Sequence, residues 1–180
     1  MRNVNLLLSA PLPLAIRRNH GLEHATLHVL GERIRPLRAA GHAEPRGFRV
    51  VGDLSADVIR AAAEEAIRRM QAGETWWAVH PGCGTNVVTS SLLTSAFAYL
   101  GTLLAGRKAG WQEKLSNAIS LGTLGALIAH PLGPLLQARV MTSADMRGAR
   151  VRAVRREYPF FLAGPFSRTV VHFVETAYEG

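Results

Sequence analysis

The sequence predicts an α+β membrane protein in which a two-helix transmembrane hairpin carries a small cytoplasmic α/β part. Two long runs without Asp, Glu, Lys or Arg, residues 75–106 and 115–138, indicate the hairpin. Short helical and strand patterns with many Arg residues surround these runs and indicate the α/β part. Charged residues are only 19% of the 180 residues, below the roughly 25% that is typical of a soluble domain.

Three segments are expected along the chain. Residues 1–84 form the cytoplasmic α/β part, residues 85–138 the transmembrane hairpin, and residues 139–180 a basic juxtamembrane helix with a C-terminal strand. Pro11 and Pro13 interrupt the apolar N-terminus, so the first 16 residues are expected to form an interfacial or lid-like segment and not a signal peptide.

Within the first segment, the pattern predicts a helix over residues 19–30, a loop over residues 39–47 and then a strand–helix–strand unit. Apolar residues at helical spacing place the helix of this unit at residues 56–72, with Ser55 as its N-cap and Gly73 after its end. Short apolar runs at 48–51 and 76–79 are expected to be its two strands. A strand at 169–174 extends the sheet.

The hairpin is expected to consist of helices at 86–105 and 115–136, each about the 20 residues needed to cross a bilayer core. Small residues recur in both helices and allow close packing in a membrane. The alternative is a pair of buried helices in a soluble bundle. The loop at 107–114 carries fewer positive charges than the outer flanks, so the positive-inside rule places both termini in the cytoplasm of a bacterial inner membrane.

The net charge of +8 points to an anionic partner. No nucleic-acid-binding signature is present, so we expect no nucleic acid and instead the lipid bilayer with its anionic headgroups. A basic helix at 143–157 is expected either to contact these headgroups or to be a solvated surface helix. A protein partner or substrate of unidentified type is also expected.

The pattern His20-Gly-Leu-Glu23-His24 is the clearest candidate for chemistry. His20 and His24 are one helical turn apart, so both imidazoles can bind one metal ion, with zinc as the candidate. Glu23 can act as the general base on a metal-bound water. The alternative is that the histidines simply decorate a polar helix face. His28 lies about 12 Å from His20 along the axis, so it is expected to have a supporting or structural role.

This H-x-x-E-H pattern resembles the inverted zinc-binding motif of the inverzincin metallopeptidases. The resemblance covers five residues and implies hydrolysis of a peptide at a zinc ion. Those enzymes take a downstream Glu as the third ligand. Here no acidic residue lies between Glu74 and Glu113, so the third ligand must differ.

His80-Pro-Gly-Cys83-Gly-Thr-Asn86 offers the third ligand, through the thiolate of Cys83 or the imidazole of His80. The alternative is a structural turn that caps the following helix through Thr85 or Asn86 and leaves Cys83 inert. His130, in the second apolar run beside Pro131, is expected to be structural. Tetrapyrrole binding through one histidine is a third possibility that no spacing requires.

With Asn19-His-Gly-Leu-Glu-His-Ala-Thr26 and residues 80–86 together, the chain resembles an uncharacterised family of small bacterial membrane proteins. The resemblance covers most of residues 17–106 and supplies no substrate or catalytic residues. Two functions stay open from the sequence. One is a membrane-anchored zinc hydrolase at the cytoplasmic interface, and the other is a non-enzymatic scaffold or assembly factor with a structural ion or none.

Overall fold

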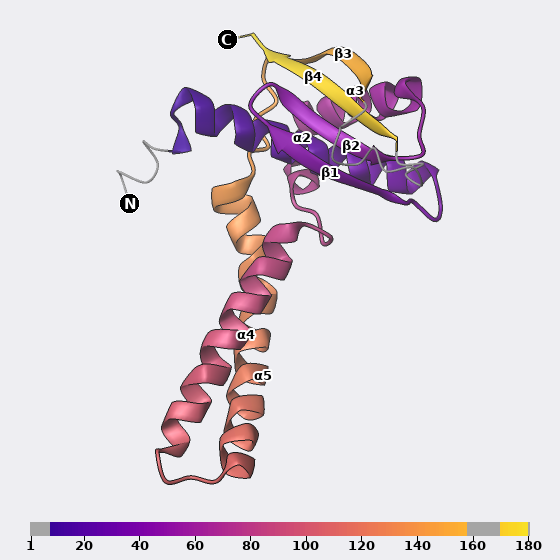
Figure 1. Ribbon diagram of the computed structural model, residues 1–180. Helices are drawn as coiled ribbons and strands as arrows, with labels where there is room; N and C mark the ends of the chain where they lie inside the picture. Colours follow the sequence, from indigo (N-terminus) through magenta and orange to yellow (C-terminus); the bar gives the residue numbers. More distant parts are fainter. Residues whose placement is uncertain (1–7, 158–169, 180) are drawn as a thin grey trace. The chain divides into compact units, whose positions relative to one another are not determined.

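The computed structural model describes residues 8–157 and 170–179, and these form two compact units. Residues up to 80 and from 138 onward make the first unit, and residues 81–137 make the second. Figure 1 labels most of the elements, which are α2 (Pro11–Arg33), β1 (Ala39–Glu44), β2 (Gly47–Gly52), α3 (Ala56–Gln71), the 3-10 helix η1 (Thr75–Ala78), α4 (Gly84–Ala105), α5 (Trp111–Leu136), the π-helical turn η2 (Gln137–Met141), β3 (Ala149–Glu157) and β4 (Val171–Tyr178). The mixed α+β class is therefore confirmed.

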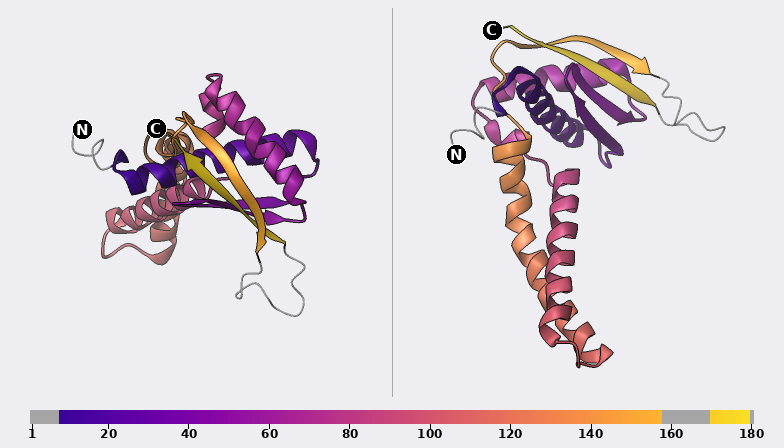
Figure 2. Two further views of the ribbon diagram at one scale, coloured as in Figure 1. Left: turned by 90° about the horizontal axis from the view of Figure 1, so that it is seen from above. Right: turned by 60° about the vertical axis from the view of Figure 1, so that its left-hand side comes forward.

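The first unit is an antiparallel sheet with helices α2 and α3 on one face (Figure 2). Its strand order is β1-β2-β4-β3. Phe48 and Val50 of β2 and Val174 of β4 point into the core, where they join Leu22 of α2 and Ile59 of α3. All five side chains are completely buried. The predicted strand near 169–174 is present from Val171 and does extend the sheet.

Helix α3 follows its local signals. The Ser55 Oγ accepts a hydrogen bond from the Val58 backbone N–H at 3.3 Å, and Gly73, with φ of 101°, follows the C-cap residue Ala72. Helix α2 begins eight residues earlier than its predicted start at residue 19. Pro11 and Pro13 do not prevent this, because the N–H groups of the first helical turn have no intrahelical partner.

The predicted strand at 76–79 is wrong, and with it the strand–helix–strand unit. Residues Thr75–Ala78 form η1, which the Trp77 indole N–H ties to the Glu74 Oε2 at 2.7 Å. Trp77 is buried while Trp76 is exposed. The two aromatic residues therefore reflect the burial of one ring in the core, and not a strand of the sheet. The predicted loop at 39–47 is also wrong over residues 39–44, because these six residues pair with β2 as strand β1. Tertiary pairing outweighs the weak strand propensity of this segment.

The predicted basic helix at 143–157 is strand β3, preceded by an irregular segment. Arg150 and Arg152 alternate with Val151 as a half-buried strand requires, although Ala and Arg are good helix formers. The Ser143 Oγ accepts a bond from the Asp145 N–H, and Asp145 Oδ1 accepts one from the Arg147 N–H. Such side chain to backbone bonds favour turns over helices.

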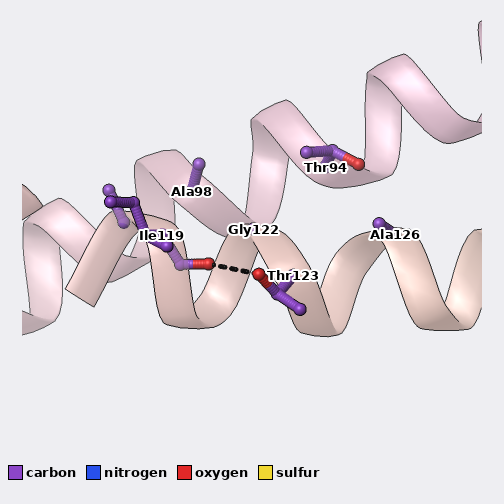
Figure 3. A pocket seen from close by; sticks show the side chains of 7 residues that line it. Thr94, Ala98, Ile119, Gly122, Thr123 and Ala126 are labelled. Carbon is purple, nitrogen blue, oxygen red and sulfur yellow. Dashed lines mark hydrogen bonds between the residues drawn. The ribbon is translucent and has the colours of Figure 1, made fainter. Parts of the chain in front are cut away.

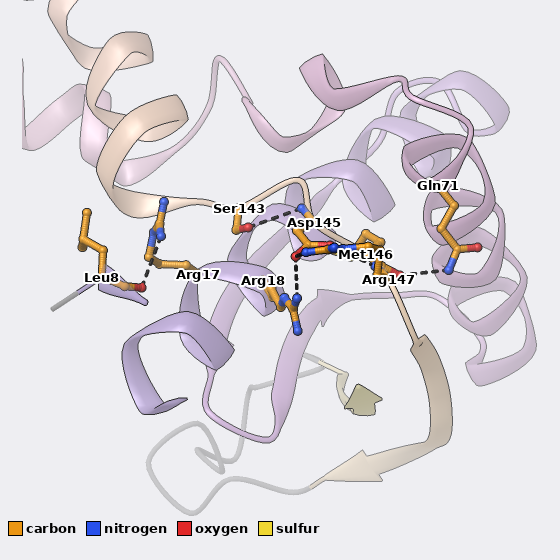
Figure 4. Close-up of polar contacts among 8 residues, drawn as sticks. All are labelled: Leu8, Arg17, Arg18, Gln71, Ser143, Asp145, Met146 and Arg147. Atoms are coloured by element: carbon orange, nitrogen blue, oxygen red, sulfur yellow. Dashed lines mark hydrogen bonds and ion pairs between the residues drawn. The ribbon is translucent and has the colours of Figure 1, made fainter. Parts of the chain in front are cut away.

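The irregular segment is held to α2 and α3 by polar contacts (Figure 4). The Ser143 N–H donates to the Arg17 carbonyl at 2.9 Å, and the Arg18 guanidinium pairs with Asp145 at 2.5 Å. On α3, the Gln71 amide donates to the Met146 carbonyl at 2.9 Å. These bonds fix the path of the chain from η2 to β3.

The second unit is an antiparallel pair, α4 and α5, whose close approach depends on small residues. An ideal Cβ at Gly125 would lie 2.6 Å from the Leu93 carbonyl oxygen, and one at Gly122 would lie 3.3 Å from the Ala98 Cβ. The small residues therefore bring the helices together as expected. A shallow groove runs along this contact (Figure 3), lined by Thr94, Ala98, Ala118, Ile119, Gly122, Thr123 and Ala126.

Two glycines of α2 give a matched test of packing in the first unit. A Cβ at Gly21 would overlap the Ser143 carbonyl oxygen, whereas one at Gly31 would meet only Leu37 Cδ2 at 3.8 Å. We expect Gly21→Ala to lower the free energy of unfolding by about 1–3 kcal/mol through overpacking. Gly31→Ala should raise it by about 0.5–1 kcal/mol through helix propensity. Thermal unfolding in detergent measures both, and equal effects would contradict the contact at Ser143.

The Asp145 ion pairs should give a pH-dependent contribution to stability. Hydrogen bonds from Arg147 and Arg18 hold the pKa of Asp145 well below its usual range. A depressed pKa stabilises the fold above the unfolded value, and this stabilisation is lost as the pH falls toward the folded pKa. Asp145→Asn should therefore lower the Tm at pH 7, and the difference from wild type should shrink below about pH 4. A difference that does not depend on pH would contradict the ion pairs.

Candidate metal centre

Three histidines form a stripe along one face of α2. His20, His24 and His28 follow one another at intervals of four residues, and the ring centroids of His20 and His24 lie 4.4 Å apart. The predicted placement of the H-x-x-E-H pattern on a helix is confirmed. His24 is only 2% exposed, so its ring lies inside the unit and not on a solvated face.

Backbone carbonyls fix the orientation and the tautomer of both rings in the motif. The Nδ1 atom of His24 lies 2.8 Å from the Ala78 carbonyl oxygen, and that of His20 lies 3.1 Å from the Met141 carbonyl oxygen. A carbonyl oxygen can only accept, so each Nδ1 carries the proton and donates it. The neutral form of each ring then has its lone pair on Nε2. Metal-binding histidines typically have this support behind the ring.

His80 follows η1 and lies beside two of these histidines. Its ring centroid is 5.7 Å from that of His24 and 4.5 Å from that of His28. Burial, followed by the charges of His28 and His24, lowers the pKa of His80 to about 4. The His80 imidazole is therefore neutral at pH 7, the form that can bind a metal.

Cys83 is the backbone N-cap residue of α4, in the second unit, and its thiol makes no capping bond. The alternative in which Thr85 or Asn86 caps the helix is wrong, because Cys83 is the N-cap residue and both of these residues lie inside α4, where no side chain makes a capping bond. The Asn86 amide instead donates to the Pro81 carbonyl and accepts from Gln137. Cys83 is three residues from His80, a stretch of chain that spans at most about 10 Å. His20, His24 and Cys83 are a group that could hold a metal ion.

Glu23 is 4% exposed, and its burial raises its pKa to about 7, although the charge of nearby His20 acts to lower it. The carboxyl group packs against Gly41 of β1, where any Cβ would overlap it. Glu23 thus faces the sheet from the side of α2 next to the histidine stripe. Its role as a general base stays a prediction.

Sequence reasoning missed the groups that orient the rings. The carbonyls of Ala78, Val79 and Met141 carry no signal in the sequence, since every residue has one and only the fold decides where it points. Of the other histidines, His130 is exposed on α5 and lines a cavity of about 280 Å³. The other residues that line this cavity are Pro81, Asn86, Ser90, Ala126, Ala129 and Pro134.

A family model described as a domain of unknown function, DUF6391, matches residues 15–154. The chain belongs to this family. An uncharacterized protein of Picosynechococcus sp. is 32% identical over 148 residues, which are 74% of this chain and 68% of the relative. No solved structure matches the chain significantly.

The DUF6391 match runs from α2 to β3 and contains every residue of the candidate metal centre. The expectation of an uncharacterised family is therefore confirmed, and the residues that carried it lie within the matched range. Neither the family description nor the name of the relative gives an activity.

Proposed function

We propose that this DUF6391 protein is a membrane-anchored metalloprotein in which His20, His24 and Cys83 bind a zinc ion. One observation carries the proposal: both histidines of the motif donate Nδ1–H to a backbone carbonyl and so present Nε2 as a lone-pair donor. This support fixes each ring before any ion binds, which lowers the cost of assembling the site.

The spacing of the rings suits one tetrahedral ion. Two imidazoles on one zinc ion, with Zn–N bonds of 2.0–2.1 Å, have ring centroids about 5 Å apart. The centroids of His20 and His24 lie 4.4 Å apart, close to this separation. Cys83 completes the group and would bind as a thiolate. His80 is the alternative third ligand, and its closer neighbour is His28.

Three protein ligands leave one position of a tetrahedral zinc ion for water, which is the arrangement of catalytic sites. With Glu23 as the base, such a water could hydrolyse a peptide or another substrate near the membrane. The packing of Glu23 against Gly41 supports the second function, a non-enzymatic scaffold or assembly factor with a structural ion. A cobalt(II)-substituted protein separates the two: added azide shifts the visible absorption bands only when the ion has an open position.

The hairpin provides the membrane anchor in this proposal. Helix α4 has 22 residues, or about 33 Å of length, and both α4 and α5 have a mean hydropathy of 1.5 over an 18-residue window. Leu92, Leu104 and Leu127 are each about two-thirds exposed. Exposed leucines over this length favour a bilayer over the core of a soluble bundle.

Charge sets the orientation within the membrane. The loop between the helices carries Arg107, Lys108 and Lys114, while many more Arg residues lie in the first unit. The positive-inside rule then places both termini in the cytoplasm of a bacterial inner membrane. Anionic headgroups at that surface would be the partners of exposed cations such as Arg152 of β3.

Removal of a ligand should remove one equivalent of zinc. We expect His24→Ala and Cys83→Ser each to lose about one equivalent relative to wild type when the detergent-purified protein is measured by elemental analysis. His42→Ala, an exposed histidine of β1, is the matched control and should keep the wild-type content. A wild type that is folded and takes up no metal from excess zinc would overturn the proposal.

The topology can be tested with the same cysteine variant. In a Cys83→Ser background, we expect Lys108→Cys to react with a membrane-impermeant maleimide in intact cells. Glu179→Cys should react only after the cells are permeabilised, because the termini face the cytoplasm. Labelling of both positions in intact cells, or recovery of the protein without the membrane fraction, would contradict the proposed anchor.

A further inference from the structure

His28 and His80 lie next to the proposed zinc ligands, and neither belongs to the His20–His24–Cys83 group. Their ring centroids are 4.5 Å apart, a separation like that of His20 and His24. His28 is anchored in the same manner as the other two histidines of α2. Its Nε2 lies 2.9 Å from the Val79 carbonyl oxygen and must donate to it, which puts the lone pair on Nδ1.

The anchoring separates His28 from the first ion. His24 donates through Nδ1 to Ala78, and His28 donates through Nε2 to the next carbonyl, Val79. Their lone pairs are therefore on different ring nitrogens, Nε2 in His24 and Nδ1 in His28. His28 also lies about 12 Å from His20 along the helix axis. An ion bound by His28 is thus a different ion from one held by His20 and His24.

A cavity of about 430 Å³ in the first unit opens beside this second pair of rings. His28, His80 and Glu32 line it together with Arg35 and the apolar side chains of Leu27 and Leu37. Glu32 follows His28 by four residues on α2, so both side chains lie on the same helix face. The cavity supplies a carboxylate, two imidazoles and space for water ligands.

We propose that His28, His80 and Glu32 form a second binding site for a divalent transition-metal ion, separate from the His20–His24–Cys83 group. Two imidazoles and one carboxylate are an established ligand set for zinc, with further positions open to water. Imidazole and carboxylate without thiolate also accept cobalt(II), nickel(II) and manganese(II). Glu32 Oε2 accepts a bond from Arg69 Nη1 at 3.0 Å, and Oε1 of the same carboxylate serves as the ligand atom.

The two sites would differ in affinity and in metal preference. The first contains a thiolate and buried His24, whereas the second opens to solvent, and Glu32 is about half exposed. A solvated carboxylate shared with Arg69 is a weaker ligand than a buried thiolate. The second ion should therefore bind more weakly than the first and be the first to leave during dialysis against a chelator.

The test uses the full-length protein in detergent, stripped with a chelator and then titrated with zinc by isothermal titration calorimetry. We expect wild type to bind two equivalents. His28→Gln should bind one equivalent and keep the tighter step, while Glu32→Gln should weaken only the weaker step by at least tenfold. His42→Gln is the matched control and should behave as wild type. Thermal unfolding of each apo variant shows that it is folded.

The outcomes separate this site from the first one. Two equivalents in His28→Gln, or a single equivalent in wild type that His24→Ala removes, would overturn the second site. A single equivalent that depends on His28 and Glu32, and not on His24 or Cys83, would support the second site and refute the first. Loss of the tighter step in His80→Gln would assign His80 to the first ion and also overturn the proposal.

Discussion

The arrangement of the candidate metal centre depends on hydrogen bonds between the histidines of α2 and backbone carbonyls. His24 and His28 bind the consecutive carbonyl oxygens of Ala78 and Val79 at 2.8 and 2.9 Å. These oxygens lie at the end of η1, and the buried Ala78 oxygen would cost free energy if it had no donor. The hydrogen bonds that pair the carbonyls of Ala78 and Val79 therefore also set the tautomers of His24 and His28. They hold the chain after η1, and with it His80, next to the histidine stripe.

Because the same hydrogen bonds hold the fold and orient the histidines, a substitution in the first unit that disturbs one also disturbs the other. Met141, which receives the bond from His20, belongs to the turn that leads from the hairpin back to the sheet. Two residues later, the Ser143 N–H donates a hydrogen bond to the Arg17 carbonyl of α2, and the Ser143 carbonyl packs against Gly21. A change at Gly21 would act on packing and on the neighbouring ligand at once. Variants at the site must therefore be compared with structural controls.

The sequence predicted the elements whose signals are local, and it failed where tertiary pairing decides. Spacing and caps were enough for α3, and length and lack of charge were enough for α4 and α5. The strand β1 has almost no strand propensity, and only its register with β2 defines it. In η1 the two Trp residues suggested a strand, but the carbonyls that a strand would pair are taken by imidazoles. For the site, the spacing identified His20 and His24, while His28 needed its carbonyl partner to be recognised as a third anchored ring.

Chain connectivity links the metal chemistry to the proposed anchor. Cys83 is the N-cap residue of α4 and lies only three residues after His80, so at most about 10 Å of chain separates the two residues. If Cys83 binds the ion and α4 crosses the membrane, as proposed, the ion would hold the start of α4, and the membrane would in turn hold the ion near its surface. A longer linker would add conformational entropy that the ion would have to overcome on binding, and the short one keeps that cost small.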